Sequence, residues 1–322
     1  MSDDARGKPT PAVTPPDRPG GDPQPRVVIV DGVPMSGLLA EPAGAEQPPH
    51  AVVVALHGGA TTSAYFDCPG FPELSLVRSG PQSGFTVLAL DRPGFGASAL
   101  YSSEFDSTPR RIDMAYRAID AMLGTRDRGA GIFLLAHSNG SELALRMAAE
   151  ERGAELLGVE ISGTGRRQQD AAAAILADAS RENIPAGLRE LLWEPAHLYP
   201  SGIAGSIRIK GGPVSPGYEA DLVRNWCHDL PDLAARVKVP VRYTLGEFER
   251  VWAIDTTAVA EVADLFTASP RVVTNLQPGG GHNLSLGHAA AAYHRDTLSF
   301  ARECCAHTDR SGTDDNFTME AS

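Results

Sequence analysis

Short apolar runs alternate with amphipathic stretches along most of this chain. Four runs, at residues 51–56, 85–90, 131–136 and 156–162, are almost continuously apolar, as strands buried on both faces of a parallel sheet are. Between the second and third runs, residues 108–123 carry apolar side chains at helical spacing. Strands that alternate with helices predict an α/β fold, in which helices cover both faces of a doubly wound, mostly parallel sheet.

The ends of the chain lack this alternation. Residues 1–25 are rich in Pro, Gly and Asp, and residues 307–322 are polar, so we predict that both segments are disordered. Immediately after the first of them, the pair Asp31-Gly32 separates two apolar runs. Such a pair between apolar runs predicts a β-hairpin.

The alternation breaks a second time between residues 163 and 237. This stretch holds an Ala-rich helical segment and several Gly and Pro residues, and a further strand entered through Pro240 is predicted at 239–245. The sequence therefore predicts a core formed by residues 26–162 and 238–306, with residues 163–237 inserted between the two parts.

Composition excludes several classes of partner. The chain has 322 residues, of which 42% are hydrophobic, enough for one large domain with an insertion. Its formal net charge of −12 gives no electrostatic basis for nucleic-acid binding. No apolar stretch approaches the roughly 20 residues that span a bilayer, and the first residues lack a signal sequence, so we expect a cytoplasmic protein without membrane attachment. The four cysteines show no C-x-x-C spacing, so no metal site is predicted.

A serine at the end of the third apolar run gives the clearest chemical signal. Ser138 is separated from that run only by His137, a helical pattern begins after it, and the small residues Ala136 and Gly140 stand two positions to either side. Small neighbours at these positions allow the sharp strand-to-helix turn of a nucleophile elbow. Alanine at the first position is a mild departure, because glycine is usual there. We predict that Ser138 is a nucleophile.

A serine nucleophile needs a base, and the base needs an acid that orients it. In the elbow architecture the acid and then the histidine follow the serine along the chain. His282 comes after an apolar run and three glycines and before an Ala-rich helical stretch. A histidine in such a loop can reach over the serine, so we predict that His282 is the base.

The acid is expected after the strand predicted at 239–245. Glu249 is the third residue after Gly246, at the place where the acid of such a triad is found, and we predict that it orients His282. Glu247 and Asp255 are alternatives from the same loop. Asp255 precedes a helical pattern, where a helix-capping role is the competing explanation.

An oxyanion hole is predicted from the residues that follow the first buried strand. The sequence His57-Gly58-Gly59 resembles the HGG-type loop that supplies one backbone N–H to the tetrahedral oxyanion. We expect the Gly59 N–H to be this donor and the Asn139 N–H to be the second. His57 is expected to hold the loop rather than to act as a base.

These motifs resemble those of α/β-hydrolase-fold enzymes, from about residue 26 to residue 304. A turn at residues 91–98 resembles the Asp-x-x-Gly-x-Gly-x-Ser turn of the same enzymes. The resemblance implies that the insertion is a helical cap that roofs the active site and shapes its pocket. Candidate pocket residues are Met114, Trp193, Tyr199 and Trp226.

The resemblance also implies a function. It implies a serine hydrolase that cleaves a carboxylic ester or thioester through an acyl-enzyme on Ser138, without a metal or an organic cofactor. The substrate would be a small molecule or an acyl group bound to a carrier. Biosynthetic acyl transfer, chain release or cyclisation with the same triad is the alternative. A non-catalytic ligand-binding protein is less favoured, because every expected position is filled.

Overall fold

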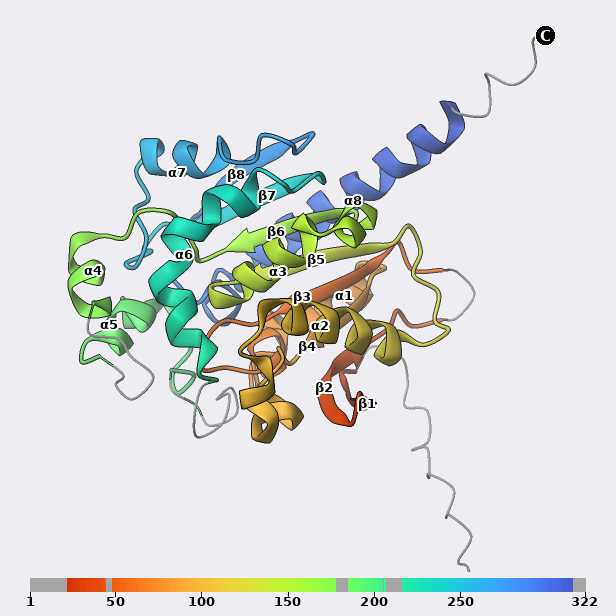
Figure 1. The fold of residues 1–322 in the computed structure, drawn as a ribbon, viewed down its shortest axis with the longest axis horizontal. Helices are drawn as coiled ribbons and strands as arrows, with labels where there is room; N and C mark the ends of the chain where they lie inside the picture. Colours follow the sequence, from red (N-terminus) through yellow and green to blue (C-terminus); the bar gives the residue numbers. More distant parts are fainter. Residues whose placement is uncertain (1–21, 45–47, 178–184, 205, 207–215, 315–322) are drawn as a thin grey trace, which may run out of the picture.

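A single mixed sheet organises the chain. The computed structural model describes residues 22–44, 48–177, 185–204, 206 and 216–314, with the side chains of 307–314 left out (Figure 1). The strands are β1 Gln24–Val30, β2 Val33–Ala40, β3 Val52–Leu56, β4 Thr86–Leu90, β5 Ile132–His137, β6 Gly158–Ser162, β7 Val241–Gly246 and β8 Val272–Gln277. They form an eight-stranded sheet in the order β1-β2-β4-β3-β5-β6-β7-β8. Along this order, neighbouring strands from β4 to β8 pair in parallel. The β1–β2 and β2–β4 pairs are antiparallel.

Helices connect most of these strands. The α-helices are α1 Leu76–Gln82, α2 Thr108–Leu123, α3 Asn139–Ala149, α4 Asp170–Leu176, α5 Leu188–Trp193, α6 Tyr218–Ala234, α7 Thr256–Ala263 and α8 Ala290–Asp314. Short 3₁₀ segments lie at Ser63–Phe66, Pro72–Leu74, Gly96–Phe105, Glu151–Glu155, Ala196–Leu198 and Leu284–Leu286. Within the described residues, no helix combines the length and the apolar character needed to cross a membrane.

Apolar packing on both faces of the sheet explains the continuous apolar runs. In β3, Val52 and Val54 belong to one buried cluster, which includes side chains of α2 and α3. Val53 and Ala55 point the other way, into a second cluster with side chains of α1 and α8. Figure 1 shows these helix pairs on opposite sides of the strands. The predicted doubly wound, mostly parallel sheet is confirmed.

Two predicted boundaries of the core need correction. β1 begins at Gln24, inside the segment 1–25 predicted to be disordered, because its first residues already pair with the end of β2. At the other end α8 continues to Asp314, past the predicted core boundary at residue 306. No proline interrupts the chain over this last stretch, so the helix can continue. Residues 1–21 and 315–322 lie outside the described residues.

The insertion between β6 and β7 contributes α4, α5 and α6. In Figure 1 these helices lie beyond the end of the sheet at which the parallel strands finish. Helix α6 packs on α3, and Arg146 of α3 pairs with Asp229 of α6 at 2.7 Å. The insertion therefore stands next to the strand end that carries Ser138.

Candidate active site

Ser138 occupies a strained turn between β5 and α3. Its backbone has φ +50° and ψ −123°, a conformation that residues other than glycine rarely adopt. The turn is held because the Ser138 N–H donates to the Ser162 carbonyl at 2.7 Å. It is also crowded: a Cβ on Gly140 would lie 2.3 Å from the Leu56 carbonyl oxygen. The glycine predicted from the elbow pattern is thus required by the packing of α3 against the end of β3.

A chain of hydrogen bonds joins Ser138, His282 and Glu249. Ser138 Oγ lies 3.3 Å from His282 Nε2. On the other side of the ring, His282 Nδ1 lies 2.9 Å from Glu249 Oε2 and 3.0 Å from Oε1. A carboxylate only accepts, so Nδ1 carries the proton and Nε2 is left to accept from the serine hydroxyl. The structure brings together the three residues that the sequence nominated for nucleophile, base and acid.

The alternative acids are engaged elsewhere. Glu247 is exposed, and its Oε2 accepts from the Gly279 N–H at 2.8 Å. Asp255 caps α7 by accepting from the Ala258 N–H at 3.0 Å, and it pairs with Arg167. Glu249, in contrast, is buried, and Oε1 also accepts from the Val251 N–H at 2.8 Å. This second hydrogen bond fixes the carboxylate while it faces the imidazole.

The glycine loop after β3 lies directly against the elbow. A Cβ on Gly58 would lie 3.2 Å from Ser138 Cβ, and a Cβ on Gly59 would lie 3.0 Å from Asn139 Nδ2. The two predicted oxyanion donors, Gly59 and Asn139, are therefore neighbours beside the serine. The absence of side chains on the loop permits this approach.

His57 holds this loop. Its Nε2 accepts from the Arg92 N–H at 3.0 Å, so Nδ1 carries the proton and donates to the Gly58 carbonyl at 2.8 Å. Burial, together with the charge of Arg92, lowers the pKa of His57 well below its usual value. A neutral histidine with both nitrogens engaged has a supporting role. Among the described residues, no group of three or more His, Cys, Asp and Glu side chains could hold a metal ion.

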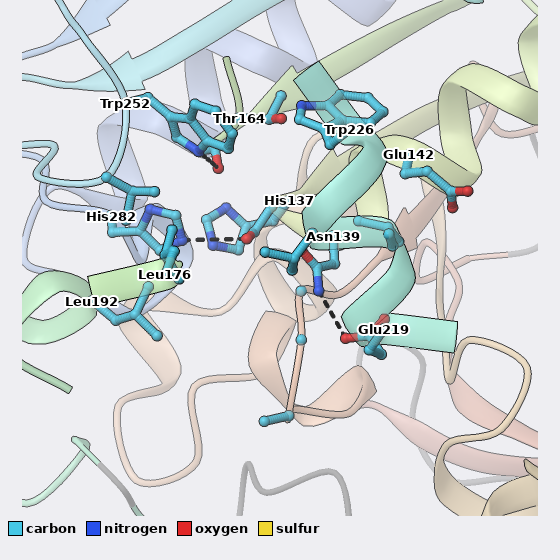
Figure 2. Close-up of a pocket in the computed structure, with 18 of the residues that line it drawn as sticks. His137, Asn139, Glu142, Thr164, Leu176, Leu192, Glu219, Trp226, Trp252 and His282 are labelled. Carbon is cyan, nitrogen blue, oxygen red and sulfur yellow. Dashed lines mark hydrogen bonds between the residues drawn. The ribbon is translucent and has the colours of Figure 1, made fainter. Parts of the chain in front are cut away.

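A cavity of about 270 Å³ opens over Ser138. In Figure 2, Trp226 and Trp252 lie at one end of it, Asn139 and Glu219 at the other, and Leu192 and His282 along one side. The apolar lining comes mainly from the insertion and from the loop after β7. These two segments contribute Leu176, Leu188, Leu192, Leu222, Val223, Trp226, Val251 and Trp252.

Hydrogen bonds hold both tryptophans in place. Trp226 Nε1–H donates to the Gly165 carbonyl at 3.0 Å, and Trp252 Nε1–H donates to the Gly163 carbonyl at 3.1 Å. Their polar atoms are thus satisfied by the chain that follows β6, which leaves the apolar rings to form the cavity wall.

Three of the four predicted pocket residues do not line the cavity. Met114 is fully buried in the core cluster on the α2 side of the sheet. Trp193 packs edge-to-face on Tyr199, with the ring centroids 5.2 Å apart. Tyr199 Oη accepts from the Asn283 N–H at 3.2 Å and so supports the loop of His282. Only Trp226 of the four lines the cavity. Trp252, which the prediction missed, stands three residues after Glu249, a position that could have suggested it.

A buried histidine, His294, supports the loop that carries His282 and makes the stability of the fold depend on pH. His294 Nε2 lies 2.8 Å from Ser285 Oγ, and burial lowers the pKa of His294 to about 3. An unfolded histidine has a pKa near 6.5, so below that pH the unfolded chain binds a proton that the native chain excludes. The stability contributed by the neutral form is therefore present above about pH 6.5 and is lost as the pH falls toward 3.

We expect His294→Gln to reduce this acid sensitivity. Between pH 7 and pH 5 the variant should lose about 2 kcal/mol less unfolding free energy than the wild type, measured by denaturant titration. His288→Gln removes an exposed histidine and should keep the wild-type dependence. Equal pH dependences in the wild type and His294→Gln would contradict this expectation.

One sequence family and several solved structures are similar to this chain. The sequence model of the alpha/beta hydrolase family matches residues 53–295. A lipase in its open form is similar in structure, with a TM-score of 0.64 at 19% identity, covering 88% of this chain and 99% of that chain. A soluble variant of monoglyceride lipase from Saccharomyces cerevisiae, in complex with a substrate analogue, gives 0.63 at 15% identity, covering 92% and 99%.

A third solved structure shares the same fold. The thioesterase domain from the curacin biosynthetic pathway gives a TM-score of 0.55 at 16% identity, covering 86% of this chain and 99% of that domain. At these identities the likeness is one of fold. No curated protein matches this chain in sequence.

Proposed function

Because the chain belongs to the α/β-hydrolase family, we propose that it hydrolyses a carboxylic ester or thioester through an acyl-enzyme on Ser138. The observation that carries this proposal is the hydrogen-bond chain from Ser138 through His282 to Glu249, at the floor of an apolar cavity. Nucleophile, base and orienting acid are aligned as acyl transfer requires.

The reaction follows from these positions. His282 Nε2 takes the hydroxyl proton while Ser138 Oγ attacks the substrate carbonyl, and the N–H groups of Gly59 and Asn139 stabilise the oxyanion. The imidazolium then gives its proton to the leaving alcohol or thiol, and the acyl-enzyme forms. Water, deprotonated by the same nitrogen, releases the acid and regenerates the serine. Glu249 stabilises the imidazolium in both halves of the reaction.

The insertion serves as a cap in this proposal. Four of its leucines and Trp226 line the cavity, so they would receive an apolar acyl group while polar atoms cluster around Ser138. The substrate is a small ester or thioester, either free or carried on an acyl carrier. Transfer of the acyl group to a hydroxyl in place of water would use the same residues. We also propose that this hydrolase acts in the cytoplasm, as the sequence leads us to expect.

A labelling and substrate experiment tests the function. The full chain is treated with a fluorophosphonate probe, the adduct is mapped by mass spectrometry, and p-nitrophenyl esters and acyl thioesters of increasing length are assayed. We expect labelling at Ser138 and release of free acid. An unlabelled protein without turnover would support the non-catalytic alternative, and an acyl product on an added alcohol would support acyl transfer.

Trp226 is expected to limit the length of the acyl group. Replacing this cavity wall by alanine in Trp226→Ala should raise the ratio of kcat/KM for long over short acyl esters by about tenfold or more, because a pocket discriminates by its apolar contacts. Trp193→Ala, outside the cavity, is the matched control and should leave the ratio unchanged. A uniform decrease across all chain lengths in Trp226→Ala would count against a role in specificity.

A further inference from the structure

A carboxylate from the insertion is hydrogen-bonded to two residues next to the predicted oxyanion hole. Glu219 is the second residue of α6 and is buried, with 6% of its surface exposed. Its Oε1 accepts from Arg92 Nη1 at 2.8 Å, and its Oε2 accepts from Asn139 Nδ2 at 2.8 Å, the contact drawn in Figure 2. One side chain of α6 therefore connects the loop after β4 to the residue that follows Ser138.

Arg92 extends this connection to the peptide bond between Gly58 and Gly59. Its Nη2 donates to the Gly58 carbonyl at 2.9 Å, and Thr61 Oγ1 donates to the same oxygen at 3.2 Å. A trans peptide is planar, with its C=O and N–H pointing in opposite directions. Donors that fix the Gly58 carbonyl therefore fix the direction of the Gly59 N–H. That N–H is one of the two oxyanion donors in the proposed reaction.

The position of Arg92 depends in turn on Glu219. The guanidinium is 1% exposed. Burial acts to lower the pKa of Arg92, but Glu219 and the neighbouring Tyr218 raise it above its usual value. A buried cation without its carboxylate partner is strongly unfavourable, so loss of Glu219 would displace the guanidinium or admit water to it.

The second donor is held by the same carboxylate. The side chain of Asn139 is anchored on Glu219, and the backbone N–H of Asn139 is the other oxyanion donor. Tyr218, at the start of α6, adds a hydrogen bond from its hydroxyl to the Pro93 carbonyl at 2.7 Å. The first turn of α6 is therefore fixed against Asn139 and against the loop after β4, whose Arg92 holds the Gly58 carbonyl.

We propose that Glu219 is a positioning residue, which orients the Gly59 and Asn139 N–H groups toward the oxyanion through Arg92 and the Asn139 side chain. This inference rests on the proposed function, because it assigns Glu219 a role in that reaction. It also means that the oxyanion is fully stabilised only when α6 is packed so that Glu219 contacts Arg92 and Asn139. An insertion that shapes the pocket would thereby control the rate of the chemical step as well as the choice of substrate.

Glu219→Gln tests this role with little change in shape. A glutamine offers one acceptor oxygen to two donors, and its amide N–H₂ faces the other donor. We expect kcat to fall by about ten- to hundredfold while KM changes by less than about threefold, because misdirected donors weaken only the transition state. Asp221→Asn is the matched control, since it removes a half-exposed carboxylate from the same helix, and it should leave kcat unchanged.

An oxyanion mimic distinguishes positioning from general damage. A trifluoromethyl ketone forms a hemiketal oxyanion on the serine, so its inhibition constant should rise in Glu219→Gln by the same factor by which kcat/KM falls. Arg92→Lys should give the same pattern, and the double variant should lose less than the product of the two single effects. If Glu219→Gln does not fold, Glu219→Asp keeps the charge but is one methylene too short to reach both donors, and the same kinetics apply.

The outcomes separate this inference from the proposed function. Wild-type kcat in a folded Glu219→Gln, a change in KM alone, or inhibition that does not follow kcat/KM would overturn the positioning role while ester hydrolysis stands. A wild-type chain that neither reacts with fluorophosphonate nor hydrolyses any ester overturns the proposed function itself.

Discussion

Replacing Ser138 by alanine is expected to lower kcat for ester hydrolysis at least about a thousandfold while the fold is retained. The Ser138 hydroxyl is the group that His282 Nε2 faces at 3.3 Å, and alanine offers nothing that could form an acyl-enzyme. A thousandfold loss corresponds to about 4 kcal/mol of transition-state stabilisation. The residual rate reflects binding and the oxyanion donors. Steady-state kinetics on highly purified variant protein, with denaturant titration to verify the fold, provide the measurement.

Ser141→Ala is the matched control for this expectation. Ser141 is a fully buried serine in the first turn of α3, the helix that begins directly after Ser138. Its hydroxyl donates to the Ser162 carbonyl at 3.3 Å. Its loss should affect stability slightly and leave the chemistry in place. A fluorophosphonate adduct on Ser141, or a Ser138→Ala enzyme with wild-type turnover, would refute the assignment of the nucleophile.

The elbow could be predicted because its constraints are local. An apolar strand, a serine between small residues and a helical pattern lie within a few positions of one another, and the turn requires that order. The structure explains the glycine at position 140 by a carbonyl against which any Cβ would clash. Local spacing distinguishes the acid less sharply, since Glu247, Glu249 and Asp255 follow the same strand. Only the folded loop shows which carboxylate is turned inward.

The pocket could not be predicted in the same way. Helical spacing identifies the buried face of α2 but not what it faces, so Met114 was placed in the pocket although it packs in the core. Trp193 and Tyr199 are aromatic residues of the insertion, yet they pack on each other and support the His282 loop. The lining depends on how short helices lie over the sheet, which a linear pattern does not specify.

The same limit explains why Glu219 was missed. Its partner Arg92 lies 127 positions earlier in the chain, and no spacing rule connects an acidic residue at a helix start to a distant turn. The turn at residues 91–98 resembles a family motif, but nothing in that motif indicates that the guanidinium of its arginine donates to the Gly58 carbonyl. Contacts between polar residues far apart in the chain are the part of a site that is hardest to predict from the sequence.

Replacing Glu249 by glutamine is expected to reduce kcat by up to about ten-thousandfold. The carboxylate accepts from His282 Nδ1–H at 2.9 Å, and the Val251 N–H holds its other oxygen at 2.8 Å. With Oε1 held by the Val251 N–H, the amide N–H₂ of a glutamine would replace Oε2, the oxygen nearer to His282 Nδ1, and would favour the tautomer protonated at Nε2. That nitrogen could then no longer accept the Ser138 proton, and no negative charge would stabilise the imidazolium.

Glu247→Gln is the control that makes this expectation specific. It changes the same chemical group in the same loop, but the Glu247 side chain is exposed and bonded to the Gly279 N–H. Its kcat should stay close to that of the wild type, and both variants should unfold at similar denaturant concentrations if only the charge at His282 matters. The reverse ranking of the two variants would transfer the role of the acid to Glu247. Burial and hydrogen bonds from His282 Nδ1–H and the Val251 N–H hold Glu249 against the imidazole, whereas Glu247 faces solvent, so the larger loss should follow substitution of Glu249.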